Sequence, residues 1–210
     1  MIRAIILDLG GVLIDLDLDA CRKAFKEVLG FHKIDEILDP CHQKGIYSDL
    51  EEGRISVDEF RRQVLLDSRP GSDPQDVDRC MEALLVGMDA AKIPYLYEIA
   101  GRYEVYALTN NNPVAMRRFR EIYAENGFDS TRVFRKEFIS SEMKLLKPDP
   151  RIFQAVLQDI GIPAAETLFV DDSPRSVEAA RGVGMNAVHY VPGTDLRTTI
   201  ETALTELDHD

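Results

Sequence analysis

The sequence is poor in cysteine and in basic residues, and each shortage excludes a class of protein. Its three cysteines, Cys21, Cys41 and Cys80, are odd in number and form no C-x-x-C pair, so neither a disulfide framework nor a zinc site is indicated. Cys21 and Cys80 fall on predicted amphipathic helices, where we expect small core residues. Lysine and arginine number 25 against 37 acidic residues, which gives a net charge of -12. Because binding to phosphate backbones requires a basic stripe, no nucleic acid or anionic membrane partner is expected.

The chain also lacks long apolar runs and low-complexity tracts. No apolar stretch is long enough to cross a bilayer, and a strand predicted to begin at Met1 or Ile2 leaves no room for a signal peptide. We therefore expect a cytoplasmic protein. The 210 residues, of which 45% are hydrophobic and 30% charged, are enough to bury a core in one domain, or in one domain with a sizeable insert.

Apolar, β-rich runs recur five times along the chain. They are IRAIILD (2–8), YEVYALT (103–109), VFRKEFIS (133–140), ETLFVDD (166–172) and NAVHYV (186–191). Helical patterns lie between them, with Pro113 and Pro174 suited to first helical positions and Gly161 suited to a helix end. Continuously apolar strands that alternate with helices indicate a parallel sheet covered on both faces. The predicted fold class is α/β, with a doubly wound, Rossmann-like parallel sheet of five strands.

Residues 17–88 interrupt this alternation. This stretch has no strand run and contains only helical patterns, the first of which begins at Leu18 directly after Asp17, a predicted N-cap. We therefore expect an inserted α-helical cap over residues 17–88, and an α/β core formed by residues 1–16 and 89–210.

Polar residues gather at the predicted carboxyl ends of three strands, where ligands bind in open parallel sheets. The residues are Asp8 after the first strand, Thr109 and Asn110 after the second, and Asp171 and Asp172 after the fourth, with Lys147 in a nearby loop. Carboxylates that converge at one sheet edge repel one another unless a cation lies among them. Oxygen ligands without histidine or cysteine select a hard ion such as Mg²⁺. Together with a lysine and a threonine hydroxyl, this ion can hold a phosphoryl group.

Four motifs, IILDLGGVLIDLD, VYALTNN, ISSEMKLLKPDP and TLFVDDSPRSVEAARGVGMNAV, span nearly the whole chain. On these motifs the chain resembles the haloacid dehalogenase (HAD) superfamily, specifically phosphatase-like members with a helical cap after the first strand. The resemblance implies that Asp8 is a nucleophile that forms an aspartyl-phosphate, and that Thr109, Asn110 and Lys147 contact the phosphoryl group. It also implies Mg²⁺ ligation by Asp8, by the Gly10 carbonyl, by Asp172 directly and by Asp171 through water.

The sequence departs from the family pattern at Gly10, where the family usually carries the second Asp of a D-x-D motif. The backbone carbonyl remains, but the side chain that serves as general acid and base is missing, and such a group contributes about 10²- to 10⁴-fold in rate. Smaller departures are Lys144 in place of a common Gly and Ser176 in place of a common Asn. A subgroup with DLG in this motif includes α-D-glucose-1-phosphate phosphatase, whose leaving group departs easily. Asp15 is a candidate substitute acid or a solvated residue.

The leading prediction is a Mg²⁺-dependent phosphatase that hydrolyses a small phosphorylated metabolite such as a sugar phosphate. Cap residues Tyr47, Glu51 and Arg54 are candidates for contact with this substrate, with surface or packing roles as the alternative. A second hypothesis is a degenerate member that binds a phosphorylated ligand or a protein without turnover. A third is a metal-free 2-haloacid dehalogenase, against which the acidic pair Asp171 and Asp172 argues. The sequence does not indicate an oligomeric state.

Overall fold

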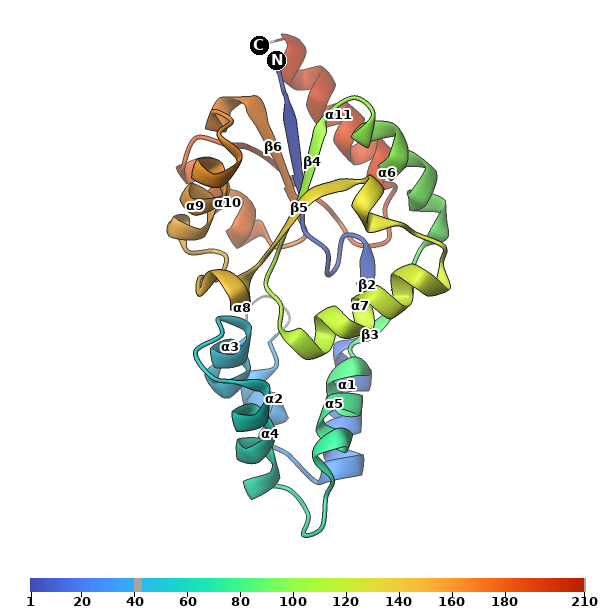
Figure 1. Ribbon diagram of the computed structural model, residues 1–210, viewed down its shortest axis with the longest axis vertical. Coiled ribbons are helices and arrows are strands. Elements are labelled where there is room, and N and C mark those ends of the chain that lie inside the picture. The colour runs from blue at the N-terminus through green and yellow to red at the C-terminus, as the bar shows by residue number, and fades with distance from the viewer. Residues whose placement is uncertain (40–42, 210) are drawn as a thin grey trace.

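A five-stranded parallel sheet forms the centre of the protein, which we describe from a computed structural model covering residues 1–39 and 43–209 (Figure 1). Cys41 lies outside these residues. The strands run in the order β5-β4-β1-β6-β7. Their bounds are Phe134–Ile139 (β5), Glu104–Thr109 (β4), Ala4–Leu7 (β1), Thr167–Asp171 (β6) and Asn186–His189 (β7). All five predicted strands and the doubly wound α/β class are confirmed.

Helices cover both faces of this sheet because successive side chains of each strand point to opposite faces. Ile5 and Leu7 of β1 pack into one apolar cluster, and Ala4 and Ile6 pack into a second one. The first cluster includes residues of α6 (Ile93–Ala100), α7 (Pro113–Glu125) and α11 (Leu196–His209), and the second those of α9 (Pro150–Ile160) and α10 (Pro174–Gly182). Every helix within the described residues is too short or too polar to cross a bilayer.

The helix starts follow the sequence signals. α7 begins at Pro113, and the side chain of Asn112 accepts hydrogen bonds from the backbone N–H groups of Val114 and Ala115. α10 begins at Pro174 with Ser173 as its N-cap. Proline fits the first position because the N–H group it lacks would have no helical partner. α7 therefore starts shortly after the end of β4, and α10 shortly after the end of β6. The capped helix starts fix the backbone at the carboxyl edge of the sheet.

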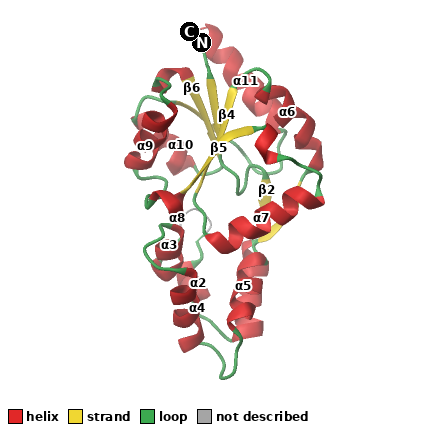
Figure 2. Cartoon of the chain, in the orientation of Figure 1, coloured by secondary structure: helices red, strands yellow, loops and turns green. Residues whose placement is uncertain are grey.

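Residues between β1 and α6 are mainly helical and lie beyond the carboxyl edge of the sheet (Figure 2). The helices are α1 (Leu18–Ala24), continued by a π-helical turn (Phe25–Leu29), and α2 (Ile34–Ile37), α3 (Gly45–Glu51), α4 (Val57–Leu66) and α5 (Pro74–Glu82). Asp17 caps α1, with its carboxylate 2.8 Å from the backbone N of Ala20. Cys21 and Cys80 are buried in the core, as predicted.

The expectation that residues 17–88 contain no strand was wrong at its last residues. β3 (Leu85–Met88) pairs antiparallel with β2 (Ile14–Leu16), which the sequence also did not indicate. The run LVGM directly continues the apolar pattern of α5, so its strand character depends on pairing with a segment about seventy residues away. These two strands connect the sheet to the helical region, and the boundary of the cap near 16/17 and 88/89 stays a prediction.

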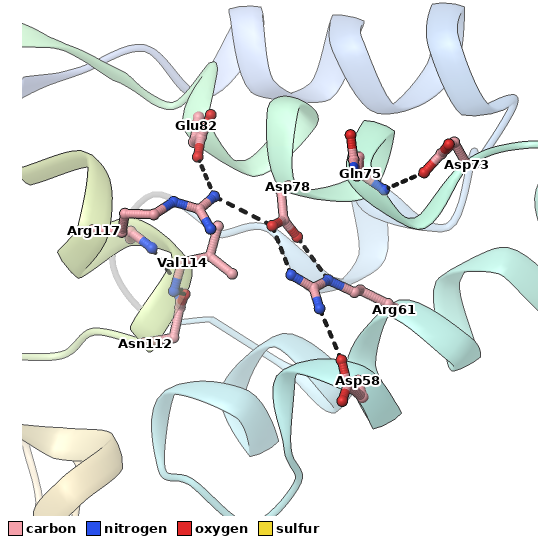
Figure 3. Close-up of polar contacts among 10 residues, drawn as sticks. Asp58, Arg61, Asp73, Gln75, Asp78, Glu82, Asn112, Val114 and Arg117 are labelled. Atoms are coloured by element: carbon pink, nitrogen blue, oxygen red, sulfur yellow. Dashed lines mark hydrogen bonds and ion pairs between the residues drawn. The ribbon is translucent and has the colours of Figure 1, made fainter. Parts of the chain in front are cut away.

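A buried carboxylate links the helical region to α7 of the core (Figure 3). Asp78 on α5 is 7% exposed and accepts hydrogen bonds from Arg61 Nε at 2.9 Å and Arg61 Nη2 at 2.7 Å. Arg117 on α7 donates to the same carboxylate at 3.2 Å and to Glu82 at 2.6 Å. One acidic side chain therefore joins α4, α5 and α7.

Replacing Asp78 by Asn is expected to reduce the free energy of unfolding by about 2 kcal/mol near neutral pH, because it leaves two arginines partly buried without their partner. Burial opposes ionisation of Asp78, but the hydrogen bonds from Arg61 and Arg117 outweigh it and hold its pKa below the usual value. The contribution is therefore present above the unfolded pKa and is lost as the pH falls below about 4. Urea unfolding at neutral and acidic pH measures both effects.

Asp58 provides the control for this measurement. It contacts the same Arg61 at 2.8 Å, but its side chain is 89% exposed, so Asp58→Asn is expected to change stability little. Equal losses for the two variants, or a loss for Asp78→Asn that persists unchanged into acid, would show that the buried network does not stabilise the protein as described.

Candidate active site

Three carboxylates meet at the carboxyl edge of the sheet. Asp8 follows β1, and its backbone N–H donates to the Val170 carbonyl at 2.9 Å, which continues the pairing of β1 with β6. Asp171 is the last residue of β6, and Asp172 follows it. One carboxylate oxygen from each of the three aspartates lies within 4.8 Å of the others. Two adjacent parallel strands that end at the same level explain this convergence.

Lys147 lies beneath these carboxylates and is 3% exposed. Its Nζ donates to Asp171 Oδ2 at 2.6 Å and to the Leu108 carbonyl at 2.9 Å, and it lies 3.0 Å from Asp8 Oδ1. Asn110 fixes the lysine backbone through two hydrogen bonds, of 2.9 Å to its carbonyl and 2.8 Å from its N–H. Burial disfavours the ammonium form, but Asp171 and Asp8 outweigh it and raise the pKa of Lys147. The lysine is therefore a fixed positive charge.

A cavity of about 130 Å³ opens above this cluster. The structure brings every predicted site residue to its lining, namely Asp8, Gly10, Thr109, Asn110, Lys147, Asp171 and Asp172. The polar end is formed by these residues. The rest of the lining is mixed. Its apolar side chains are Leu16, Leu84, Leu85, Ala115 and Phe119, and its polar ones include Gln43, Tyr47, Glu51, Asn111, Asn112, Ser173 and Ser176.

Asp8 and Asp172 resist ionisation in the absence of a cation. Burial raises the pKa of Asp8 to about 7, with Asp171 and Asp172 adding to the effect against the opposing charge of Lys147. Burial, followed by Asp171, raises the pKa of Asp172 to about 6. Asp171 has donors on both oxygens, Lys147 on Oδ2 and the Ser173 N–H on Oδ1 at 2.7 Å. The donor set fits a hard divalent cation, which Asp8, Asp172 and the Gly10 carbonyl would hold.

Gly11 is a structural requirement of this cluster that the sequence analysis did not single out. Its φ is +74°, and a Cβ at this position would lie 2.1 Å from Asp172 Oδ2. The neighbouring Gly10 is different, because a Cβ there would meet only Leu16 Cδ1 at 3.4 Å among its nearest neighbours. The second of two adjacent glycines was the available signal. A Cβ at position 10 therefore makes only ordinary contacts, so no close neighbour requires glycine there.

Replacing Gly11 by Ala is expected to displace the Asp172 carboxylate, to weaken Mg²⁺ affinity by at least about tenfold and to reduce stability by about 1–3 kcal/mol from the positive φ alone. Gly127→Ala is the matched control, since Gly127 has φ of +63° and nothing within 4 Å of a Cβ. Calorimetric titration with Mg²⁺ measures the change in affinity, and chemical unfolding measures the change in stability. Unchanged Mg²⁺ affinity in Gly11→Ala would show that Asp172 does not depend on this close approach.

The cap candidates divide into two groups. Tyr47 and Glu51 are buried and line the cavity. Arg54 does not line it, because its exposed side chain forms ion pairs with Asp49 and Glu52 instead. The hypothesis that Arg54 reaches the substrate is therefore wrong in this conformation.

The structure also shows the surroundings of Asp15, Lys144 and Ser176, which the sequence singled out. Asp15 is exposed on β2 and does not line the cavity, which argues against it as a substitute acid. Lys144 has φ of +59°, the left-handed conformation in which glycine is common, and its Nζ donates to the Gly53 carbonyl at 2.7 Å. Ser176 is buried and lines the cavity.

The fold and the cluster together define a class: open α/β proteins whose acidic edge holds a divalent cation beside a phosphoryl group. The chain belongs to the haloacid dehalogenase-like hydrolases, since the model of that family matches residues 2–184. It is 31% identical over 205 residues to a D-ribitol-5-phosphate phosphatase of Bacteroides thetaiotaomicron. The aligned region covers 97% of this chain and 99% of that relative.

Solved structures agree with this assignment. One is a HAD family enzyme of Bacteroides thetaiotaomicron in complex with magnesium and inorganic phosphate, which matches with a TM-score of 0.87 at 32% identity. The superposed region covers 94% of this chain and 98% of that enzyme's chain. A HAD-like family hydrolase of Porphyromonas gingivalis has a TM-score of 0.84 at 32% identity and covers 97% and 98%. A 2-haloacid dehalogenase of Pseudomonas syringae, at 20% identity and a TM-score of 0.61, covers 98% of this chain and 99% of its own and shows the fold alone. The chain is therefore a haloacid dehalogenase-like hydrolase, and the similar proteins include a named phosphatase and an enzyme whose structure contains magnesium and inorganic phosphate.

Proposed function

We propose that the protein hydrolyses a small sugar or sugar-alcohol phosphate through an aspartyl-phosphate on Asp8. The observation that carries the proposal is the meeting of Asp8, Lys147 and the Asp171–Asp172 pair at one end of a small cavity. A nucleophile beside a buried cation, with a second cation held by neighbouring acids, is the arrangement that phosphoryl transfer needs. The cap of residues 17–88 contributes the opposite wall of this cavity.

The two carboxylate oxygens of Asp8 have different contacts and different proposed roles. Oδ1 accepts a hydrogen bond from the Leu9 N–H at 2.7 Å and lies 3.0 Å from Lys147 Nζ. These two contacts fix the carboxylate, and among the described residues no donor occupies Oδ2, which is therefore the oxygen that attacks phosphorus. Thr109, Asn110 and Lys147 hold the phosphoryl oxygens. Mg²⁺, held by Asp8, Asp172 and the Gly10 carbonyl with Asp171 acting indirectly, neutralises phosphoryl charge when it is bound.

The size of the cavity and two resemblances support the substrate class. A volume of about 130 Å³ suits a leaving group of a few carbon atoms. The relative named as a D-ribitol-5-phosphate phosphatase points to a sugar alcohol, and the DLG motif points to the subgroup that includes α-D-glucose-1-phosphate phosphatase. Both leaving groups are small and hydroxylated. The cytoplasm stays the predicted location.

The experiment is phosphate release from a panel containing D-ribitol 5-phosphate, glucose 1-phosphate, acetyl phosphate and nucleotides, with Asp8→Asn as the blank. We expect turnover that requires both Mg²⁺ and Asp8 and that is fastest with a sugar or sugar-alcohol phosphate. Release no faster than the blank on every compound would reject the proposal in favour of a protein that binds without turnover. Fastest turnover of a nucleotide would reject the substrate class alone.

A further inference from the structure

Glu51, in the last turn of α3, is a buried carboxyl group without a structural partner. The residue is 8% exposed and lines the cavity with Asp8, Gly10 and Lys147. Among the described residues, its carboxylate forms no hydrogen bond and no ion pair. A buried acidic side chain is almost always paired, because an unpaired one is costly. A partner supplied by the substrate accounts for its position.

The backbone of Glu51 is fixed to the core at two neighbouring points. Ser140 Oγ donates to the Glu51 carbonyl at 2.6 Å and accepts from the Asn111 N–H at 2.8 Å. Lys144 Nζ donates to the Gly53 carbonyl at 2.7 Å. The end of α3 is therefore attached to the loop that follows Thr109, which forms the phosphate end of the cavity. These contacts hold the backbone of Glu51 beside the loop that carries Asn110 and Asn111.

We propose that Glu51 is the general acid and base that Gly10 does not provide. The proposal rests on the proposed phosphatase function. As Asp8 forms its bond to phosphorus, the bond from phosphorus to the leaving oxygen breaks, that oxygen keeps the electron pair, and Glu51 gives it a proton. In the second step, Glu51 as carboxylate takes a proton from water while the water oxygen attacks phosphorus and the bond to Asp8 breaks. Glu51 is then protonated again and Asp8 is free.

The electrostatics of the cavity agree with a proton on Glu51 before the reaction. Burial raises the pKa of Glu51 to about 8, and Asp8 adds to this shift while Lys147 opposes it. The other titratable group that faces it on α3, Tyr47, is buried, which raises its pKa well above the usual value, so it stays neutral. Burial and the charge of Asp8 therefore favour the protonated form of Glu51, which is the form that can donate a hydrogen.

The test compares two leaving groups in Glu51→Gln, which keeps the size of the side chain but has no acidic proton. Hydrolysis of D-ribitol 5-phosphate, whose alkoxide needs a proton, is expected to lose about 10²- to 10⁴-fold in kcat/KM. The kcat/KM for p-nitrophenyl phosphate reports the first step alone, and because its phenolate leaves without a proton, this value is expected to stay within about tenfold. Glu52→Gln is the matched control, because Glu52 pairs with Arg54 and does not line this cavity, and it is expected to keep both activities.

A second variant tests the same role by restoring an acid at position 10. The Cβ of Gly10→Asp would make only ordinary contacts with Leu16. Combined with Glu51→Gln, this change is expected to recover at least about tenfold of the lost alkyl phosphatase activity. Equal losses on both substrates, or no loss on either, would overturn the role of Glu51 while wild-type turnover still supports the phosphatase. Absence of wild-type turnover on both substrates would overturn the phosphatase itself and this role with it.

Discussion

Asp8→Asn is expected to lower phosphate release by at least about 10⁴-fold, because loss of a covalent nucleophile removes the whole two-step route. The same variant is expected to be more stable than the wild-type protein when Mg²⁺ is removed. Burial and the neighbouring aspartates raise the pKa of Asp8 to about 7, so the ionised form destabilises the folded protein. Asparagine fills nearly the same space without this charge.

The sign of the stability change depends on pH. A folded-state pKa above the unfolded value of 3.8 means that stability is lost as the pH rises from about 4 to about 7. The gain in Asp8→Asn is therefore expected to be full at about pH 8 and absent below about pH 4. Thermal unfolding in a chelator at both pH values measures it. Continued turnover by Asp8→Asn would exclude Asp8 as the nucleophile. A lower stability of Asp8→Asn than of the wild-type protein at about pH 8 would show that the charge of Asp8 does not destabilise the fold.

Lys147→Met is expected to lower kcat/KM by about 10³-fold, the scale of one preorganised charge at a transition state. The folded protein without metal should also lose about 3–5 kcal/mol, because two buried carboxylates are left without their cation. Asp8 and Asp171 both contact Lys147 Nζ, at 3.0 and 2.6 Å. Mg²⁺ is expected to restore part of this stability, since it supplies positive charge to the same acids.

Lys136→Met is the control for this variant, because Lys136 forms an exposed ion pair with Asp159 on the surface. It is expected to leave activity and the Mg²⁺ dependence of unfolding unchanged. Thermal unfolding across a Mg²⁺ titration, together with steady-state kinetics, compares the two lysines. If Mg²⁺ stabilises Lys147→Met no more than the wild-type protein, the lysine and the cation do not share the same acids.

The sheet and its acidic edge could be predicted because their signals are local. Each strand is a short apolar run bounded by turn residues, and Asp8, Thr109 and Asp171 stand at the strand ends, where a parallel sheet brings them together. Lys147 was placed by its motif, and the structure adds its contacts with Asp8 and Asp171. Their catalytic roles remain predictions.

The features that could not be predicted depend on contacts between distant segments. β2 and β3 become strands by pairing with each other, and LVGM alone continues a helical pattern. Glu51 and Arg54 stand three residues apart in one charged stretch, and nothing local shows that Glu51 faces the cavity while Arg54 pairs with Asp49 at the surface. The contact that ties the end of α3 to the core, from Ser140 Oγ to the Glu51 carbonyl, joins residues far apart in the sequence.

Gly10 alters how the site is understood. The sequence identified the missing acid, and the structure shows that a Cβ at position 10 would make only ordinary contacts with Leu16. No close neighbour therefore requires glycine there, and Glu51 is an acidic side chain in the same cavity lining. A hydrolase can keep the phosphate end of the family site and take its proton donor from the cap.

We expect Asp8 to carry the phosphoryl group during turnover. The direct measurement is acid quenching of the protein during turnover of its best substrate with Mg²⁺, followed by mass spectrometry of the peptide that contains Asp8. We expect a peptide heavier by one phosphoryl group in the wild-type protein and no such peptide in Asp8→Asn. Rapid turnover with the phosphoryl group on another residue, or continued turnover by Asp8→Asn, would contradict it.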